Sequence, residues 1–354
     1  MNSLIQKYIK DHKVDGFLIT DKANVRYLTG FTGSNGQIFI TDKKGEFLTD
    51  GRYITQASEE VSKDFSCRFY RKMYKEIAEI VSNKGKTKRL LFEPGALTVK
   101  GLNQYKELTK GITWVPLKEE GAALRIKKNR NEINILKKAA KIAHTALEKV
   151  LSEIKPGDVE KDIALALEIG MRKGGADGVS FEPIVASGTR SALPHGRASD
   201  KKIKSGELLT IDYGSVYKGY CSDETVTVVV GKADKKQKQI YAIVKDAHDM
   251  AVDAIKPGVT CGQIDKIGRD HISKKGYGKN FTHSTGHGVG LEVHELPTIA
   301  SENKQKLEPG MVITVEPGIY LPGWGGVRIE DMILVTDSGH EVLTPTDKAF
   351  RSIG

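Results

Sequence analysis

The chain has 354 residues, a formal net charge of +10 at pH 7 and three cysteines. This length exceeds one ordinary hydrophobic core and favours two domains. No apolar run approaches the roughly 20 residues of a membrane span, and three widely separated cysteines favour reduced thiols over a disulfide framework. Because the N-terminus also lacks the apolar core of a signal peptide, the sequence predicts a cytoplasmic protein with no membrane association.

The positive charge does not indicate nucleic-acid binding. The excess lysines are scattered singly or in pairs, as in Lys235-Lys236 and Lys274-Lys275, without interleaved aromatic residues or an arginine-rich stripe. Such a pattern favours a solvated, lysine-rich surface over a nucleic-acid interface. We therefore expect no nucleic acid among the partners.

The first 122 residues alternate strand and helix signals. Strands are predicted at 16–20, 37–41, 46–49 and 89–92, and helices at 73–81 and 98–108. This alternation predicts an N-terminal α/β domain over residues 1–122.

A long amphipathic helix is predicted at 124–154, where apolar residues recur at helical spacing. We place the domain boundary just before it, so the second domain covers residues 123–354. The start of this helix therefore marks the change from one domain to the next.

The second domain contains a faint internal repeat. The motif I-K-P-G occurs at 154–157 and again at 255–258, and S-G-E-L-L-T-I-D-Y-G at 205–214 aligns with P-G-M-V-I-T-V-E-P-G at 309–318 at nearly the same offset. Two matches at one offset predict duplicated halves with a pseudo-twofold axis. Chance similarity between two glycine-rich turns is the alternative.

Four acidic residues adjoin strongly apolar runs. They are Asp212, Asp223, Glu316 and Glu330. In the duplicated arrangement Asp212 and Glu316 correspond, so a carboxylate from each half would meet near the axis. A buried carboxylate is costly unless it is paired or bound to a metal. One acid beside a strand is usually solvated, but four in this setting indicate a cation.

Three histidines cluster in the segment F-T-H-S-T-G-H-G-V-G-L-E-V-H-E at 281–295. His283 and His287 have the spacing of a helical zinc motif, but the glycines between and after them would destabilise a helix interior. The sequence therefore predicts extended or looping backbone here, with glycines that let the chain pass close to another group.

Four carboxylates and one imidazole carry four negative charges, which is too many for a single divalent ion. Two divalent ions bridged by carboxylates would balance them. Hard oxygen ligands favour Mn²⁺, with Co²⁺, Zn²⁺ or Fe²⁺ as alternatives.

With these motifs the chain resembles the metal-dependent Xaa-Pro peptidases, aminopeptidase P and prolidase, of the pita-bread (creatinase/methionine aminopeptidase) fold. The resemblance rests on I-D-Y-G, C-S-D-E-T, G-H-G-V-G, V-E-P-G and R-I-E-D, in that order, and on G-F-L-I-T and N-V-R-Y-L-T-G-F-T-G-S near the N-terminus. It implies an α/β (α+β) fold with an accessory domain before a pita-bread catalytic domain. The metal ligands that it implies are Asp212, Asp223, His287, Glu316 and Glu330.

The resemblance also implies roles in substrate binding and proton transfer. The implied catalytic residues are His195, His294 and Glu316, and the implied substrate-binding residues are His195, His283, His294 and Arg328. A hydrogen-bonded structural histidine is the alternative for His283. For Arg328, which shares a strand face with Glu330, a structural ion pair is an equal alternative.

The resemblance implies hydrolysis of the bond between an N-terminal residue and a following proline, with short peptides as substrates and a homodimer as the assembly. The loop E-L-P-T-I-A-S-E-N after His294 has no arginine, whereas many prolidases carry one hereabouts that could hold a dipeptide's carboxylate. This favours aminopeptidase P, with prolidase as the alternative. A catalytically silent binding module of the same fold is a third reading, although no ligand is missing.

Overall fold

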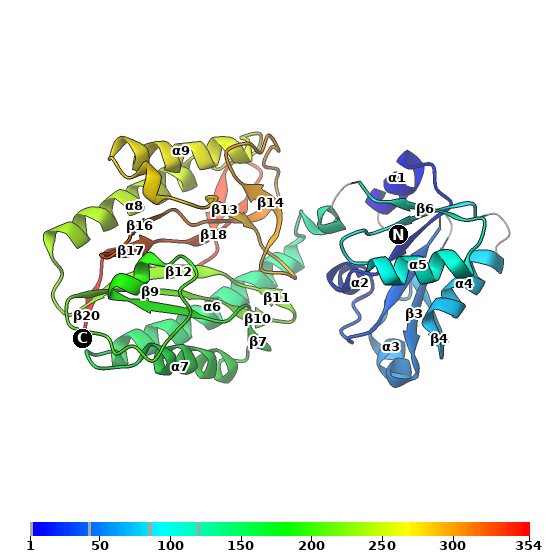
Figure 1. The fold of residues 1–354 in the computed structure, drawn as a ribbon, viewed down its shortest axis with the longest axis horizontal. Coiled ribbons are helices and arrows are strands. Elements are labelled where there is room, and N and C mark those ends of the chain that lie inside the picture. The colour runs from blue at the N-terminus through cyan, green and yellow to red at the C-terminus, as the bar shows by residue number, and fades with distance from the viewer. Residues whose placement is uncertain (1–2, 42–43, 84–86, 119–120) are drawn as a thin grey trace. The chain divides into compact units, whose positions relative to one another are not determined.

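The computed structural model describes residues 3–41, 44–83, 87–118 and 121–354 (Figure 1). The chain divides into two compact units, Met1–Arg125 and Ile126–Gly354. Among the described helices, none is long and apolar enough to cross a membrane. All three cysteines are free thiols, with Cys67 exposed and Cys221 and Cys261 buried.

The described part of the N-terminal unit is built on a six-stranded sheet in the order β4-β3-β2-β1-β5-β6. The strands are β1 (Gly16–Ile19), β2 (Gln37–Ile40), β3 (Gly45–Asp50), β4 (Phe65–Tyr70), β5 (Arg89–Phe92) and β6 (Thr113–Pro116). The helices are α1 (Ser3–Asp11), α2 (Lys22–Thr29), α3 (Ile54–Glu60), α4 (Met73–Asn83) and α5 (Val99–Leu108). Side chains alternate between two cores, since Phe17 and Ile19 pack in one cluster and Leu18 in the other.

The strands and helices predicted in this unit are confirmed, within a few residues at their ends. Thr98 caps α5 by accepting a hydrogen bond from the backbone N–H of Gly101. The prediction missed α2, α3, β4 and β6, which are short or carry mixed patterns.

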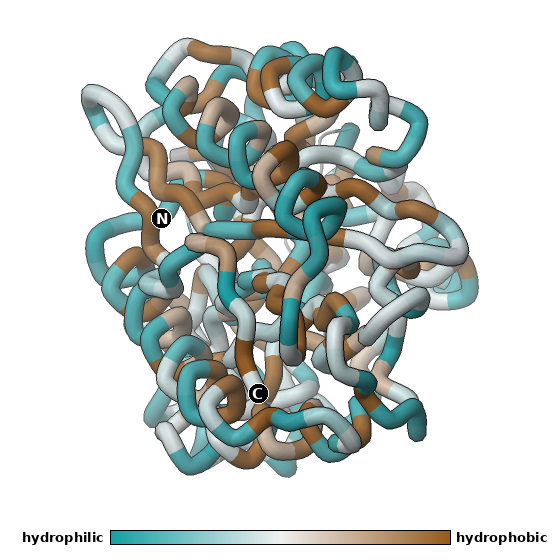
Figure 2. The backbone as a smooth tube through the Cα atoms, turned by 90° about the vertical axis from the view of Figure 1, so that its left-hand side faces the viewer, coloured by the Kyte–Doolittle hydropathy of each residue, from teal (hydrophilic) through white to brown (hydrophobic). Residues whose placement is uncertain are grey.

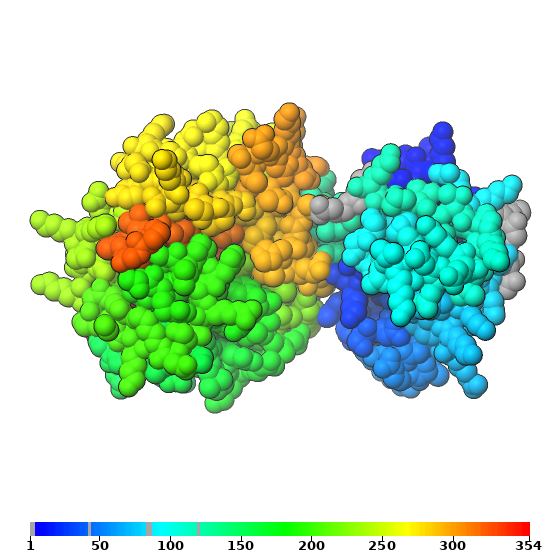
Figure 3. Space-filling model, viewed as in Figure 1, coloured from blue at the N-terminus to red at the C-terminus, as the bar shows by residue number. Residues whose placement is uncertain are grey.

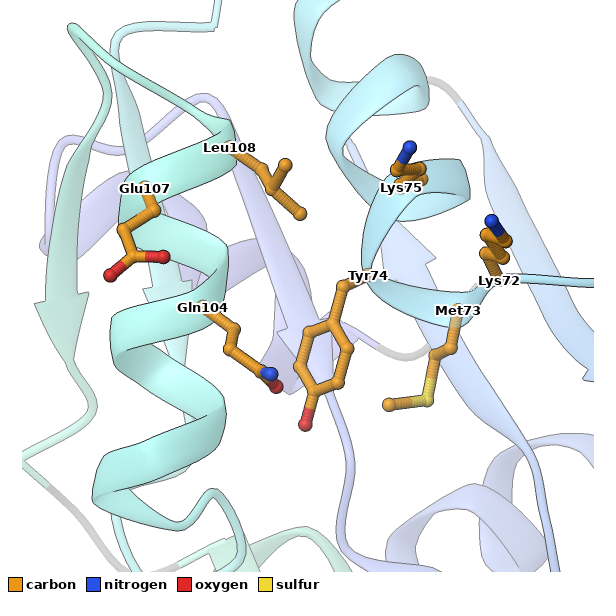
Figure 4. A pocket seen from close by; sticks show the side chains of 7 residues that line it. All are labelled: Lys72, Met73, Tyr74, Lys75, Gln104, Glu107 and Leu108. Atoms are coloured by element: carbon orange, nitrogen blue, oxygen red, sulfur yellow. The ribbon is translucent and has the colours of Figure 1, made fainter.

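A surface pocket of about 330 Å³ lies between α4 and α5 (Figure 4). Its lining residues are Lys72, Met73, Tyr74, Lys75, Gln104, Glu107 and Leu108. This lining has a single carboxylate and no histidine, so it does not supply the ligands of the predicted metal site. The predicted ligands all lie in the C-terminal unit.

The C-terminal unit begins with an extended segment, and its long helix starts later than predicted. Helix α6 covers Arg130–Glu153, and the side chain of Asn129 caps it in a capping box with Glu132. Before it, Lys127 forms an antiparallel bridge with Met311. The predicted start at residue 124 was wrong because residues 124–125 end a separate 3₁₀ helix, Gly121–Arg125, and the bridge and the capping box fix residues 126–129 in a non-helical conformation.

Each half of the C-terminal unit combines two helices with antiparallel strands. The first half holds α6, α7 (Glu160–Lys173), β8 (Ile184–Ser187), β9 (Glu207–Tyr213) and β12 (Glu224–Val230). The second holds α8 (Lys235–Asp253), α9 (Cys261–Lys274), β13 (Gly286–Gly288), β14 (Glu295–Ile299), β15 (Val312–Val315), β18 (Asp331–Val335) and β19 (His340–Val342). The sheet orders are β20-β12-β9-β8 and β14-β13-β15-β18-β19, with β20 at Ser352–Ile353.

The two halves cover opposite sides of the unit. In Figure 1, α6 and α7 lie on one side of the strands and α8 and α9 on the other. In Figure 3 the green first half and the yellow second half occupy opposite parts of the visible face. The remaining strands are β7 (Gly178–Val179), β10 (Ser215–Tyr217) and β11 (Tyr220–Cys221), and the hairpin of β16 (Gly318–Leu321) and β17 (Gly325–Arg328). The placement of two helices from each half on opposite sides of the strands agrees with the predicted duplication.

The helices carry apolar and polar residues in alternation, while the central strands are buried throughout. Figure 2 shows teal and brown segments alternating along the helices. All seven residues of β12 are buried. A polar side chain on such a strand has no access to bulk water and needs a partner inside the protein.

Candidate metal centre

The ends of two antiparallel strand pairs bring the four predicted acids together. Asp212 lies near the end of β9, opposite Thr225 of β12, and Asp223 immediately precedes β12. Glu316 follows β15 and Glu330 precedes β18, its antiparallel partner. Each half of the unit therefore supplies two carboxylates from equivalent positions.

Potential ligand atoms of Asp223, His287 and Glu330 all lie within 4.8 Å of one another. The Nε2 atom of His287 is 3.6 Å from Asp223 Oδ2 and 3.6 Å from Glu316 Oε1. The remaining acid, Asp212, acts electrostatically on Asp223. Thr225, which lies opposite Asp212, donates from its hydroxyl to Glu330 Oε2 at 2.7 Å, so Asp212 adjoins the other four residues of the predicted ligand set.

The four carboxylates are largely buried, and their hydrogen bonds do not offset the energetic cost of burying their charge. Burial, reinforced by the negative charge of neighbouring acids, raises the pKa values of Asp223 and Glu330 well above the usual range. Burial raises the pKa of Glu316 to about 8. It also raises the pKa of Asp212, against the opposing effect of Arg328. Divalent cations would stabilise these groups in their charged form.

Two side-chain atoms, Asp212 Oδ1 and His287 Nε2, are free within the described part of the protein to bind a metal ion. Asp212 Oδ1 is buried without a hydrogen-bond partner among the described residues. His287 donates from Nδ1 to the carbonyl of Gly288 at 3.0 Å, which leaves Nε2 unprotonated and facing the acids. Burial lowers the pKa of His287 to about 4, so its ring is neutral near pH 7. The donor set of carboxylates and one imidazole suits hard or borderline divalent ions.

His283 has both ring nitrogens occupied by the protein. Nδ1 lies 2.7 Å from the Ser284 carbonyl and therefore donates to it, so Nε2 accepts from the Tyr320 hydroxyl at 2.9 Å. Burial lowers the pKa of His283 to about 4. This geometry favours the structural alternative for His283 over substrate contact.

Arg328 is likewise engaged within the protein. Its guanidinium donates to Asp212 Oδ2 at 2.8 Å, and also to Thr225 Oγ1, the Pro194 carbonyl and the Tyr320 hydroxyl. Only 3 % of its surface is exposed. The geometry favours an ion pair that orients Asp212, and the contact with Pro194 ties the segment that carries His195 to the same group.

His294 and His195 are the more accessible histidines of the site. The ring centroid of His294 is 4.4 Å from that of His287 in an edge-on arrangement. Burial, and then the electrostatic effect of His195, lower the pKa of His294. His195 is exposed. Both rings can therefore reach a ligand near the acids.

The glycines around His287 pack against neighbouring strands. A Cβ atom on Gly286 would lie 2.0 Å from the Thr314 carbonyl, and one on Gly288 would lie 2.1 Å from that of Leu296. These residues let β13 sit tightly between β14 and β15. Close strand packing therefore requires glycine at both positions.

Two buried acids that the sequence reasoning missed hold the histidine segments. Asp265 accepts hydrogen bonds from Thr285 and forms a two-point ion pair with Arg269, which also donates to the His283 carbonyl at 2.7 Å. In the other half, Glu160 accepts bonds from residues at 187, 190 and 199, which flank His195. A buried acid in each half thus fixes a histidine segment.

Known proteins share this architecture. The model of the creatinase/prolidase N-terminal domain matches residues 3–127, and that of metallopeptidase family M24 matches residues 134–337. The chain is 41 % identical to an Xaa-Pro dipeptidase of Pyrococcus furiosus, over 97 % of each chain.

Solved structures agree. An Xaa-Pro dipeptidase from Bacillus anthracis superposes with a TM-score of 0.96 at 44 % identity, covering 99 % of this chain and 98 % of that one. An X-Pro aminopeptidase from Thermotoga maritima gives 0.90 at 37 % identity, covering 98 % and 100 %. The predicted pita-bread fold with an accessory domain is confirmed. The chain therefore belongs to metallopeptidase family M24 and carries the creatinase/prolidase N-terminal domain.

Proposed function

We propose that this protein is a prolidase, an Xaa-Pro dipeptidase that uses two divalent metal ions. The main support is that a curated relative and a solved structure, both named Xaa-Pro dipeptidase, match nearly the whole chain at 41 % and 44 % identity. These relatives favour the dipeptidase alternative over the aminopeptidase reading drawn from the arginine-free loop. The similarity to an X-Pro aminopeptidase keeps that activity as the second candidate.

In this proposal Asp212, Asp223, His287, Glu316 and Glu330 would hold the two ions, for which Mn²⁺ is the first choice. When bound, such ions polarise a carbonyl oxygen and lower the pKa of a water molecule toward neutrality. The unpartnered Oδ1 of Asp212 and the unprotonated Nε2 of His287 support the ligand assignment.

Proton transfer would fall to Glu316, His294 and His195. Glu316 would accept a proton in its charged form, which bound divalent ions would stabilise. His294 has a lowered pKa and is neutral at pH 7, so it can donate a hydrogen bond to a developing oxyanion or assist the departing nitrogen. A leaving proline nitrogen has no hydrogen, so the bond before it requires a site that does not bind an N–H there.

A dipeptide also presents a free carboxylate, which Arg328 is poorly placed to bind. Four of its donor contacts already go to protein groups. We therefore assign Arg328 to ligand orientation. We retain as proposals that the protein acts in the cytoplasm, that it forms a homodimer and that its catalytic domain starts near residue 123.

Peptide length tests the proposal directly. In one assay with Mn²⁺-loaded protein, Ala-Pro and Ala-Pro-Ala compete, and Ala-Ala serves as the control that lacks proline. We expect Ala-Pro to be cleaved with the higher kcat/KM and Ala-Ala to be spared. A clear preference for Ala-Pro-Ala would establish the aminopeptidase instead, and cleavage of neither proline peptide would reject both candidates.

A further inference from the structure

Three of the proposed metal ligands are each followed directly by a polar residue that faces away from the metals. The pairs are Asp212 with Tyr213, Asp223 with Glu224, and Glu330 with Asp331. Because side chains alternate across a strand, the second member of each pair lies on the opposite face of its sheet. Tyr213, Glu224 and Asp331 are all at most 4 % exposed, so each needs a partner on that face.

These three residues join one buried network that Lys348 completes. The Tyr213 hydroxyl donates to Glu224 Oε2 at 2.6 Å. The ammonium of Lys348 contacts Glu224 Oε1 and lies 3.2 Å from Asp331 Oδ1. On its other side, Asp331 Oδ2 lies 3.2 Å from Nε2 of His248 in α8.

Lys348 enters this network from the C-terminal segment, outside the strands that it connects. Its side chain is 6 % exposed and carries the ammonium between two carboxylates. The acids belong to different halves, since Glu224 begins β12 and Asp331 begins β18. The ammonium therefore joins the two halves behind the metal centre, in addition to the direct hydrogen bond from the Thr225 hydroxyl to Glu330.

We propose that Lys348 is a positioning residue for the metal centre, because it links Glu224 and Asp331 and so fixes the separation of the adjoining ligands Asp223 and Glu330. Tyr213 extends the link to Asp212. The inference rests on the proposed function, which makes Asp223 and Glu330 ligands. A shift of either strand end would change the distance between two of the carboxylates that would hold the ions, and metal affinity depends on such supporting contacts.

The test is Mn²⁺ binding to metal-free, full-length protein, measured by calorimetry at one fixed pH. Lys348→Met should weaken binding by about tenfold or more, in line with the roughly 10- to 100-fold effects of removing groups that support ligands. Lys238→Met is the matched control, because Lys238 lines the same surface hollow as Lys348 but is exposed. It should bind Mn²⁺ like the wild type.

A second variant covers the possibility that Lys348→Met does not fold, since that change strands two buried acids. Tyr213→Phe removes only the hydroxyl that holds Glu224, and it should weaken Mn²⁺ binding by a smaller factor. Tyr105→Phe is its control, because the Tyr105 hydroxyl is equally buried and donates to Gln37 in the N-terminal unit at 3.0 Å. Both changes lower stability, but only Tyr213→Phe should alter metal affinity.

Activity gives a second readout. The Mn²⁺ concentration for half-maximal Ala-Pro cleavage should rise in the network variants, while KM for the peptide stays near the wild-type value. Folded Lys348→Met or Tyr213→Phe protein with wild-type Mn²⁺ affinity would overturn the inference and leave the proposed function intact. Wild-type protein that fails to bind two ions would instead overturn the proposed function, and this inference with it.

Discussion

Replacement of Arg328 by methionine distinguishes the two roles that its position allows: an ion pair that orients Asp212, and a contact with substrate. The side chain is 3 % exposed and donates to Asp212, Thr225, Tyr320 and the Pro194 carbonyl. Arg328→Met leaves Asp212 buried without its counter-charge, and breaking a buried pair in this way costs about 3–5 kcal/mol. The side chain of Asp212 keeps 14 % exposure, so we expect the lower end, about 3 kcal/mol in the free energy of unfolding.

Urea denaturation of the metal-free protein at pH 7 measures this cost. The control is Arg351→Met, which removes an ion pair with Glu148 whose side chains are 27 % and 41 % exposed; such a surface pair contributes about 1 kcal/mol or less. Equal stability of the two variants, together with a raised KM for Ala-Pro only in Arg328→Met, would show that Arg328 binds substrate and would refute the ion-pair assignment.

Three further substitutions test the site. Glu330→Gln should abolish turnover and lower bound metal in elemental analysis, because it removes one of the negative charges that would balance two cations; full metal content with normal activity would reject Glu330 as a ligand. His287→Ala should lose metal, whereas His294→Ala should keep it and lose rate, and equal metal loss would mean that the ligand is the wrong histidine.

The sequence predicted those features whose cause is local. The strand at Gly16–Ile19 is a short apolar run beside a glycine, and α5 begins at a threonine cap. The four acids could be singled out because each adjoins an apolar strand, where a charge is costly. The resemblance then supplied the histidine, and the geometry around His287 agrees with it.

Features that depend on contacts between distant segments escaped prediction. The network of Lys348, Glu224 and Asp331 joins a C-terminal lysine to two strands, and no local pattern shows which acid that lysine meets. The sequence nevertheless contained a signal for a second buried network. Two adjacent polar residues in a buried strand face opposite sides of the sheet, so the second one needs its own partner. The sequence could not show either that protein groups accept the hydrogen bonds of the Arg328 guanidinium, since one of them, the Pro194 carbonyl, comes from a remote loop.

Stepwise addition of Mn²⁺ to metal-free protein, with Ala-Pro cleavage followed at each step, tests the central claim most directly. The arrangement of Asp212, Asp223, His287, Glu316 and Glu330 predicts no cleavage without metal and a maximum rate when two ions are bound per chain. Full activity in the metal-free protein, or no cleavage of Ala-Pro with two ions bound, would contradict the assignment of a two-metal Xaa-Pro dipeptidase.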